Sequence, residues 1–157
     1  RPVSAQAPAI RAETYRAHRR PERLVDADQV QAALHDPDCR LINALSRPQF
    51  EGSGGTHYGR PGSIPGSVNV PARELVDPQT GCLLPDAQLR ARFEAAGAFD
   101  AARAIHYCGG GVAASTTAFV HEMLGPPGWS LYDHSLLEWS TRPELPMQLR
   151  ADGPRAG

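Results

Sequence analysis

A cysteine followed by three glycines constrains the fold of this chain more than any other stretch: Cys108-Gly109-Gly110-Gly111. Residues 103–107 before it have the apolar pattern of a short buried strand, and residues 115–124 after it have a helical pattern. A backbone without side chains can curl so that several N–H groups point toward one sulfur, and a following helix adds its own free N–H groups. The stretch therefore predicts a strand, a tight turn and a helix, with Cys108 as a nucleophile held as a stabilised anion.

Other interpretations of this stretch stay open. A cysteine that ends a strand is often a small buried hydrophobic residue, and three glycines can simply connect a strand to a helix. His106 lies two positions before Cys108, so the two side chains can share one face of the strand. A Cys–His couple therefore competes with a histidine that is hydrogen-bonded inside the protein. Further on, His121-Glu122 starts like a zinc-binding motif, but Gly125 replaces the second histidine, so both residues are expected to face solvent.

The same loop disfavours a phosphatase with a cysteine nucleophile. Such an enzyme needs an arginine six positions after the cysteine to hold the phosphoryl oxygens. This chain has Ala114 at that position, and the next arginine is Arg142. The loop offers uncharged N–H groups around one sulfur, which suits a small anionic adduct on that sulfur.

Short apolar runs alternate with amphipathic segments along the rest of the chain. Strands are expected at 39–45, 67–70, 103–107 and 129–132, with an edge strand at 23–25, and the main helices at 26–34, 86–96 and 115–124. The last of these helices is expected to bury Ala118, Phe119, Met123 and Leu124. The alternation is typical of an α/β fold with a central, mostly parallel sheet and helices on both faces. Ligands of such sheets bind beyond the carboxyl ends of the strands, where Cys108 falls.

The length and composition fit one domain with its own core. The chain has 157 residues, and its first segment is rich in Pro, Ala and Arg without an apolar period. We therefore expect a linker or N-terminal arm over residues 1–22, the domain over 23–148 and a tail over 149–157. Because the chain opens at Arg1 instead of a methionine, we expect it to be part of a longer protein or to have lost a leader.

Charge and cysteine usage exclude several classes of protein. The net charge is -1 without a basic run, and no apolar stretch is long enough to cross a membrane, so neither a nucleic acid nor a membrane is indicated as a partner. Cys39, Cys82 and Cys108 lack the spacing of a disulfide framework or a zinc site. We expect reduced thiols, no metal and a cytoplasmic location, or a periplasmic one if a leader has been removed. The absence of lysine excludes a Schiff-base lysine and, with abundant Ala, Pro and Gly, is typical of a GC-rich bacterial genome.

A long loop from Glu51 to Gly66 is rich in glycine and proline. Loops of this length inside a compact domain are often functional. It carries His57, Tyr58 and Arg60, and we predict that Arg60 and His57 help to bind a small anionic substrate. The alternative for Arg60 is an ordinary solvent-exposed side chain.

Three segments, in this order, resemble the motifs of rhodanese-like sulfurtransferases. Residues 62–71 (GSIPGSVNVP) are similar to the family's GHIPGAVNVP signature, and residues 107–115 (YCGGGVAAS) are similar to its active-site loop. Residues 132–139 (YDHSLLEW) are similar to its YDGSWSEW segment. The likeness runs from about residue 23 to residue 147 and resembles in particular the catalytic C-terminal domain of a tandem thiosulfate/3-mercaptopyruvate sulfurtransferase.

This resemblance implies a sulfurtransferase with Cys108 as its catalytic nucleophile. The cysteine would take a sulfane sulfur from a small anionic donor, such as thiosulfate or 3-mercaptopyruvate, and pass it from a persulfide to cyanide, a thiol or a protein. The family needs no metal or organic cofactor, and the proline-rich start resembles a linker after a preceding rhodanese-like domain. The residues expected to hold the persulfide through their N–H groups are Gly109, Gly110, Gly111, Val112, Ala113, Ala114 and Ser115.

Several residues depart from the family pattern. Members often have aspartate, arginine and histidine where this chain has Asn43, Leu45 and Ser63, and Gln49 occupies the place of an arginine used for the donor. These departures support a second hypothesis, in which the domain is a protein-interaction or sulfur-relay module with little turnover of small molecules.

Overall fold

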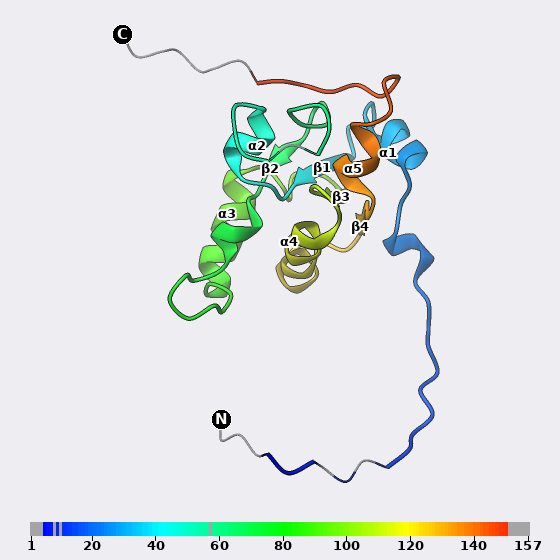
Figure 1. The fold of residues 1–157 in the computed structure, drawn as a ribbon, viewed down its shortest axis with the longest axis vertical. Helices are drawn as coiled ribbons and strands as arrows, with labels where there is room; N and C mark the ends of the chain where they lie inside the picture. The colour runs from blue at the N-terminus through cyan, green and yellow to red at the C-terminus, as the bar shows by residue number, and fades with distance from the viewer. Residues whose placement is uncertain (1–4, 8, 10, 57, 151–157) are drawn as a thin grey trace.

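The computed structural model describes residues 5–7, 9, 11–56 and 58–150 of the chain. Within these residues, a parallel sheet is flanked by helices on both faces (Figure 1). None of the described helices is both long and apolar enough to span a membrane. The strands are β1 (Cys39–Asn43), β2 (Val68–Asn69), β3 (Arg103–Tyr107) and β4 (Trp129–Leu131); the helices are α1 (Ala27–Ala33), α2 (Arg47–Glu51), α3 (Asp86–Ala95), α4 (Val112–Leu124) and α5 (Ser135–Trp139), with 3-10 helices η1 (Pro21–Arg23) and η2 (Ala72–Leu75).

The strands lie in the order β2-β1-β3-β4, and every pair is parallel. The predicted α/β fold with a parallel sheet is therefore confirmed. The edge strand expected at 23–25 is reduced to a single bridge between Leu24 and Leu131, because η1 occupies the residues before it. β3 lies between β1 and β4, so Cys108 follows the carboxyl end of an interior strand.

The core consists of two clusters, one on each face of the sheet. On one face α1 and α5 pack through residues such as Val30 and Trp139, both fully buried. On the other face α3 and α4 pack through residues such as Phe93 and Val120, which are also fully buried. Figure 1 shows this arrangement, with α1 and α5 together on one side and α3 and α4 on the other.

The two ends of the described chain differ in their contacts. Before η1 the described residues have no regular secondary structure and run away from the domain as an extended segment (Figure 1). At the other end, the N–H group of Arg150 still donates to the carbonyl oxygen of Glu51 at 3.2 Å. The packed part of the chain thus reaches beyond residue 148, while most of the predicted tail lies outside the described residues.

Local sequence determines where α1 and α4 begin. Asp26 Oδ1 accepts a hydrogen bond from the Gln29 N–H group at 2.9 Å, and Gln29 Oε1 accepts one from the Asp26 N–H group at 3.0 Å, which forms the capping box of α1. α4 begins at Val112, earlier than the predicted residue 115, because Gly111 adopts a φ of 81° and turns the chain directly into the helix. The early start places the first N–H groups of α4 within a few residues of Cys108.

The buried face of α4 differs from the predicted one. Phe119 and Met123 were expected in the core, but they are 56% and 45% exposed. His121 was expected to face solvent, but it is only 2% exposed. Both predictions are wrong for the same reason: the helix turns His121 and Thr117 toward β3, where a buried histidine provides them with hydrogen-bond partners.

This hydrogen-bond chain joins β3 to α4. His106 Nδ1 lies 3.0 Å from Thr117 Oγ1, and His106 Nε2 lies 2.9 Å from His121 Nδ1. His121 Nε2 lies 3.2 Å from the carbonyl oxygen of Pro126. Neutral rings satisfy these three contacts if His121 donates to Pro126, His106 donates to His121 and the Thr117 hydroxyl donates to His106. The single Thr117 proton is then shared between His106 and the carbonyl oxygen of Ala114, which lies 3.0 Å from Thr117 Oγ1. Burial lowers the pKa of both imidazoles, and His121 lowers the pKa of His106 further.

We expect the folded state to lose stability on acidification because of these histidines. Folded His106 stays neutral, whereas the unfolded chain takes up a proton with a pKa of about 6.5. The free energy of unfolding should therefore fall below that pH, by up to about 1.4 kcal/mol per pH unit for such a group. Urea unfolding near pH 7.5 and near pH 5.5 measures the change.

Two variants separate this effect from the titration of other groups. In a His106→Asn variant, the free energy of unfolding should fall less between the two pH values than in the parent protein. His35→Asn, which replaces an exposed histidine, should behave like the parent protein. An identical pH dependence in all three proteins would contradict the assignment of neutral buried rings.

Candidate active site

Cys108 follows β3 directly and is 2% exposed. Its N–H group donates to Ser135 Oγ at 3.0 Å, and this hydroxyl donates in turn to the carbonyl oxygen of Tyr132 at 2.7 Å. The serine therefore connects the backbone of the cysteine to the segment between β4 and α5. A buried N–H group that lacked this partner would carry a desolvation cost.

The start of α5 also binds the carbonyl groups of the loop. The N–H group of Leu136 donates to the carbonyl oxygen of Cys108 at 3.2 Å, and the N–H group of Leu137 donates to that of Gly109 at 2.8 Å. Because the two carbonyls are bound by α5, their direction is fixed. A fixed direction for the carbonyls also fixes the peptide planes, and so determines where the next N–H groups point.

The N–H groups that follow Cys108 have no acceptor within the described part of the chain. This holds for every residue from Gly109 to Ala114, the last three of which form the first turn of α4. Such N–H groups at a helix start are a ready site for an anion. Ser115 does not belong to the set, because its N–H group donates to the carbonyl oxygen of Gly111 at 3.0 Å. The predicted set of N–H donors is corrected to residues 109–114.

A side chain at each of the three glycines would meet a different neighbour. A β-carbon on Gly109 would collide with the ring of Tyr58, and one on Gly110 would lie 2.7 Å from Leu137 Cδ1. Gly111 has a φ of 81°, and a β-carbon there would meet Asp133. Gly111 is required by its positive φ and by the backbone of Asp133, whereas a side chain at Gly110 would displace the exposed side chain of Leu137, and one at Gly109 would displace the ring of Tyr58.

Ser135 has a backbone conformation that is rare for its residue type. Its φ is 50°, the only positive value for a residue other than glycine in the described chain. Such a conformation costs energy and persists where the surroundings demand it. Here it allows one side chain to accept from Cys108 while the next two backbone N–H groups bind the loop. We infer that the local strain serves the geometry of the cysteine loop.

Arg60 has a different role from the predicted one. Its guanidinium donates to the carbonyl oxygens of Ser140 at 2.9 Å, Arg142 at 2.7 Å and Leu145 at 2.8 Å. These bonds bind the long loop to the chain after α5 and direct the guanidinium toward backbone carbonyls. The prediction that Arg60 binds the substrate is therefore corrected. His57, the other predicted substrate ligand, lies outside the described residues.

His106 does not form the couple with Cys108 that the sequence left open. Both of its ring nitrogens bind side chains of α4 on the face of the sheet opposite to α5, and the alternative of an internally hydrogen-bonded histidine holds. The two remaining cysteines lie elsewhere. Cys39 begins β1, at the amino end of the sheet, and burial raises the pKa of its thiol. Cys82 is exposed in a turn.

Sequence reasoning missed the parts played by Ser135, Tyr58 and Leu137. The signal for Ser135 and Leu137 was the resemblance of residues 132–139 to a family segment, and that for Tyr58 was its place in the long loop from Glu51 to Gly66; neither contained information about contacts. Among the described residues, no group of three or more His, Cys, Asp or Glu side chains is arranged to hold a metal ion.

Fold and site together define the class of protein. This is a parallel α/β domain with a cysteine at the end of an interior strand, inside a glycine loop that leads into a helix. The chain belongs to the rhodanese-like domain family, whose model matches residues 26–142.

Two sulfurtransferases are among its relatives. The chain is 31% identical over 137 residues to the mitochondrial thiosulfate/3-mercaptopyruvate sulfurtransferase 1 of Arabidopsis thaliana, with 86% of this chain and 36% of that protein covered. It is 33% identical over 132 residues to the 3-mercaptopyruvate sulfurtransferase of Escherichia coli K12, with 82% of this chain and 46% of that protein covered. The chain thus spans less than half the length of either relative.

A solved structure shows the same fold. The anaerobic ergothioneine biosynthesis enzyme from Chlorobium limicola, in complex with its natural substrate trimethyl histidine, matches with a TM-score of 0.75 and 25% sequence identity. The match covers 85% of this chain and 33% of that one.

Removal of the Ser135 hydroxyl should weaken the cysteine loop. We expect Ser135→Ala to lower the free energy of unfolding by about 1–3 kcal/mol, because the Cys108 N–H group is left buried without an acceptor. The matched control is Ser63→Ala: Ser63 is 1% exposed, but its hydroxyl has no hydrogen-bond partner among the described residues. Equal losses for the two variants in urea unfolding would show that the hydrogen bond to Cys108 contributes nothing.

A substitution of Arg60 should affect stability more than substrate binding. Arg60→Gln removes several charge-assisted hydrogen bonds to carbonyl oxygens. We therefore expect it to lower the free energy of unfolding, measured in urea, by about 3 kcal/mol. The KM for whichever sulfur donor the protein turns over should change less than about twofold, since the guanidinium faces the backbone. The control Arg73→Gln, at an exposed position, should alter neither quantity. A large rise in KM without a loss of stability would restore Arg60 as a substrate ligand.

Proposed function

We propose that this domain is a sulfurtransferase in which Cys108 carries the transferred sulfur as a persulfide. One observation supports this proposal above the others: among the residues that the structure describes, nothing accepts from the N–H groups of residues 109–114, while the carbonyls of Cys108 and Gly109 are bound by α5. A site with fixed N–H donors stabilises negative charge without reorganisation during the reaction. The names of the relatives support the same reaction class.

The first half of the reaction forms the persulfide. The Cys108 thiolate attacks the outer sulfur of thiosulfate; a new sulfur–sulfur bond forms as the old one breaks, and sulfite leaves with the electron pair of the broken bond. The terminal sulfur of the persulfide then carries a negative charge, which the N–H groups of the loop and the first turn of α4 are suited to stabilise. With 3-mercaptopyruvate as the donor, the carbon–sulfur bond would break instead. Its electron pair would leave on the enolate of pyruvate, which takes up the proton that the donor's thiol gives up.

The second half returns the free thiolate. A thiophilic acceptor, such as cyanide, attacks the terminal sulfur, and the bond between the two sulfurs breaks with its electrons returning to Cys108. Thiocyanate leaves, and no net oxidation of the protein occurs. The two half-reactions form a ping-pong cycle, as expected for a covalent intermediate.

The residues near the carboxyl end of β1 give little support to a strongly cationic donor site. Asn43 and Leu45 are buried, and Asn43 Oδ1 accepts from the Leu45 N–H group at 2.9 Å. Gln49 Nε2 donates to the carbonyl oxygen of Thr56 at 2.8 Å. These side chains bind neighbouring chain segments, so we propose that the donor is held mainly by the N–H groups of the cysteine loop.

The alternative function, a sulfur relay to a protein thiol, is favoured by the rim of the loop. Val112 is 84% exposed and Leu137 is 57% exposed, although both are apolar and lie beside the loop. Exposed apolar side chains next to a reactive group suit contact with a second macromolecule. A relay module would form the Cys108 persulfide but transfer its sulfur slowly to cyanide.

One experiment tests both functions. The protein is incubated with thiosulfate or with 3-mercaptopyruvate, and its intact mass is measured before cyanide is added and thiocyanate is determined. The parent protein should gain one sulfur atom and release thiocyanate, whereas Cys108→Ser should do neither. The matched controls Cys39→Ser and Cys82→Ser keep the loop cysteine and should react like the parent.

The outcomes distinguish the alternatives. A sulfur gain without thiocyanate release would favour the relay. Activity that persists in Cys108→Ser, or that is lost in Cys82→Ser, would contradict Cys108 as the nucleophile.

A further inference from the structure

Each of the three glycines after Cys108 lies next to a different side chain. A β-carbon on the first would meet the ring of Tyr58, one on the second the side chain of Leu137, and one on the third the carboxylate of Asp133. Leucine has no polar hydrogen, and an ionised carboxylate only accepts hydrogen bonds. Of these three neighbours, only Tyr58 therefore has a side chain that can donate a hydrogen bond to an anion at the loop.

The hydroxyl of Tyr58 lies at the end of the ring that faces Gly109. The ring atoms nearest to a β-carbon on Gly109 are Cζ, Cε1 and Cε2, and the hydroxyl oxygen is bonded to Cζ. Gly109 follows Cys108 directly and contributes one of the free N–H groups of the loop. Among the described residues the hydroxyl has no hydrogen-bond partner, so its proton is available to a ligand.

Contacts of both the backbone and the ring hold Tyr58 in place. Ser140 Oγ lies 2.6 Å from the carbonyl oxygen of Tyr58 and 2.6 Å from that of Leu136, and its single proton is shared between them. The Tyr58 side chain is partly buried and packs against the core cluster to which Cys108 belongs. A group that is already fixed beside the reacting atoms loses little freedom when a substrate binds, so this hydroxyl is suited to orient a sulfur donor.

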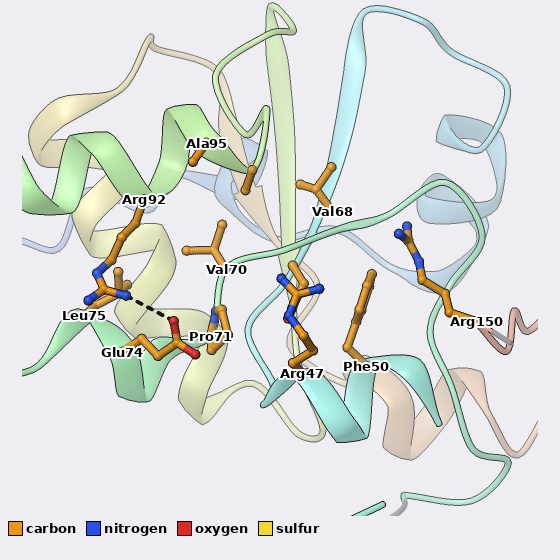
Figure 2. A pocket seen from close by; sticks show the side chains of 12 residues that line it. Arg47, Phe50, Val68, Val70, Pro71, Glu74, Leu75, Arg92, Ala95 and Arg150 are labelled. Carbon is orange, nitrogen blue, oxygen red and sulfur yellow. Dashed lines mark hydrogen bonds and ion pairs between the residues drawn. The ribbon is translucent and has the colours of Figure 1, made fainter. Parts of the chain in front are cut away.

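The arginines that could have bound an anionic donor face elsewhere. The guanidinium of Arg60 donates to backbone carbonyls after α5. Three more arginines line a cavity of about 340 Å³ at the edge strand β2, and Figure 2 shows Arg47 on α2, Arg92 on α3 and Arg150 near the end of the described chain. None of the residues that line this cavity belongs to residues 108–115. An uncharged hydroxyl beside the loop is therefore a contact for the donor that these cations do not replace.

We propose that Tyr58 binds the sulfur donor, by donating a hydrogen bond from its hydroxyl to the oxyanion on the part of the donor that leaves. This inference rests on the proposed function, since it needs Cys108 to take sulfur from an anionic donor. With thiosulfate the acceptor is an oxygen of the sulfonate end, which leaves as sulfite with the electron pair of the broken sulfur–sulfur bond. With 3-mercaptopyruvate it is the carboxylate. The hydroxyl keeps its proton, and its hydrogen bond strengthens as negative charge grows on the leaving group.

The two half-reactions should depend on this hydroxyl to different extents. Sulfite that takes the sulfur back from the persulfide reverses the first half-reaction and passes through the same transition state, so it needs the same hydrogen bond. Cyanide carries no oxyanion and attacks the same sulfur without it. The hydroxyl therefore distinguishes between acceptors, whereas a purely structural role of Tyr58 would affect both acceptors alike.

Tyr58→Phe removes the hydroxyl and keeps the ring. Sulfur gain from thiosulfate and from 3-mercaptopyruvate is followed by intact mass. Protein that carries the persulfide is then freed of the donor and discharged either with sulfite or with cyanide, while thiosulfate or thiocyanate is measured. Sulfur gain and discharge by sulfite should each be at least about tenfold slower than in the parent protein, and discharge by cyanide should change less than about twofold.

The matched control is Tyr15→Phe. Tyr15 lies in the segment before η1 and is 88% exposed, so the loss of its hydroxyl should leave all three rates at the values of the parent. Urea unfolding of both variants confirms that they are folded.

The outcomes separate this inference from the proposed function. Discharge by sulfite at the same rate in Tyr58→Phe and Tyr15→Phe would overturn the role of the hydroxyl, and so would an equal slowing of sulfite and cyanide in Tyr58→Phe. In both cases sulfur transfer at Cys108 would stand. A parent protein that gains no sulfur from either donor would instead contradict the proposed function, and the inference with it.

Discussion

The cysteine loop depends on its hydrogen bonds to the start of α5. The Cys108 N–H group binds the Ser135 hydroxyl, and the carbonyls of Cys108 and Gly109 accept from the next two N–H groups of α5. A glycine-rich segment has a large conformational entropy in the unfolded chain, so it needs external contacts to keep one shape. The positive φ of Ser135 is the local cost of forming these contacts from one short segment.

The sheet holds the cysteine loop and the start of α5 in position for these hydrogen bonds. β3 is an interior strand, and the histidine chain on its far side joins it to α4, whose first turn supplies half of the unbound N–H groups. The cysteine therefore lies between two helix starts, α4 and α5, that are held against the same strand. The free donors of this arrangement are backbone N–H groups, so an anion held there would not require a positive net charge, and the net charge of the chain is -1.

The same architecture leaves a second region open at the edge of the sheet. β2 has a neighbour on one side only, and the cavity forms where α2, η2 and α3 surround this edge without filling it. The two regions thus differ in chemistry: backbone N–H groups dominate at the loop, and arginine side chains dominate at the edge. This difference follows from position, because an interior strand end is enclosed by backbone, whereas an edge strand is accessible to long side chains.

The sequence by itself determined the order of strands and helices, the parallel α/β class and the place of Cys108 at a strand end, because periodicity, glycine and proline are local signals. Only the tertiary structure decided which groups the polar side chains contact. Arg60 binds carbonyls far along the chain, His121 is buried against β3, and Ser135 supports the loop. These contacts join residues that are distant in sequence or depend on the rotation of a helix about its axis, and no local pattern contains that information.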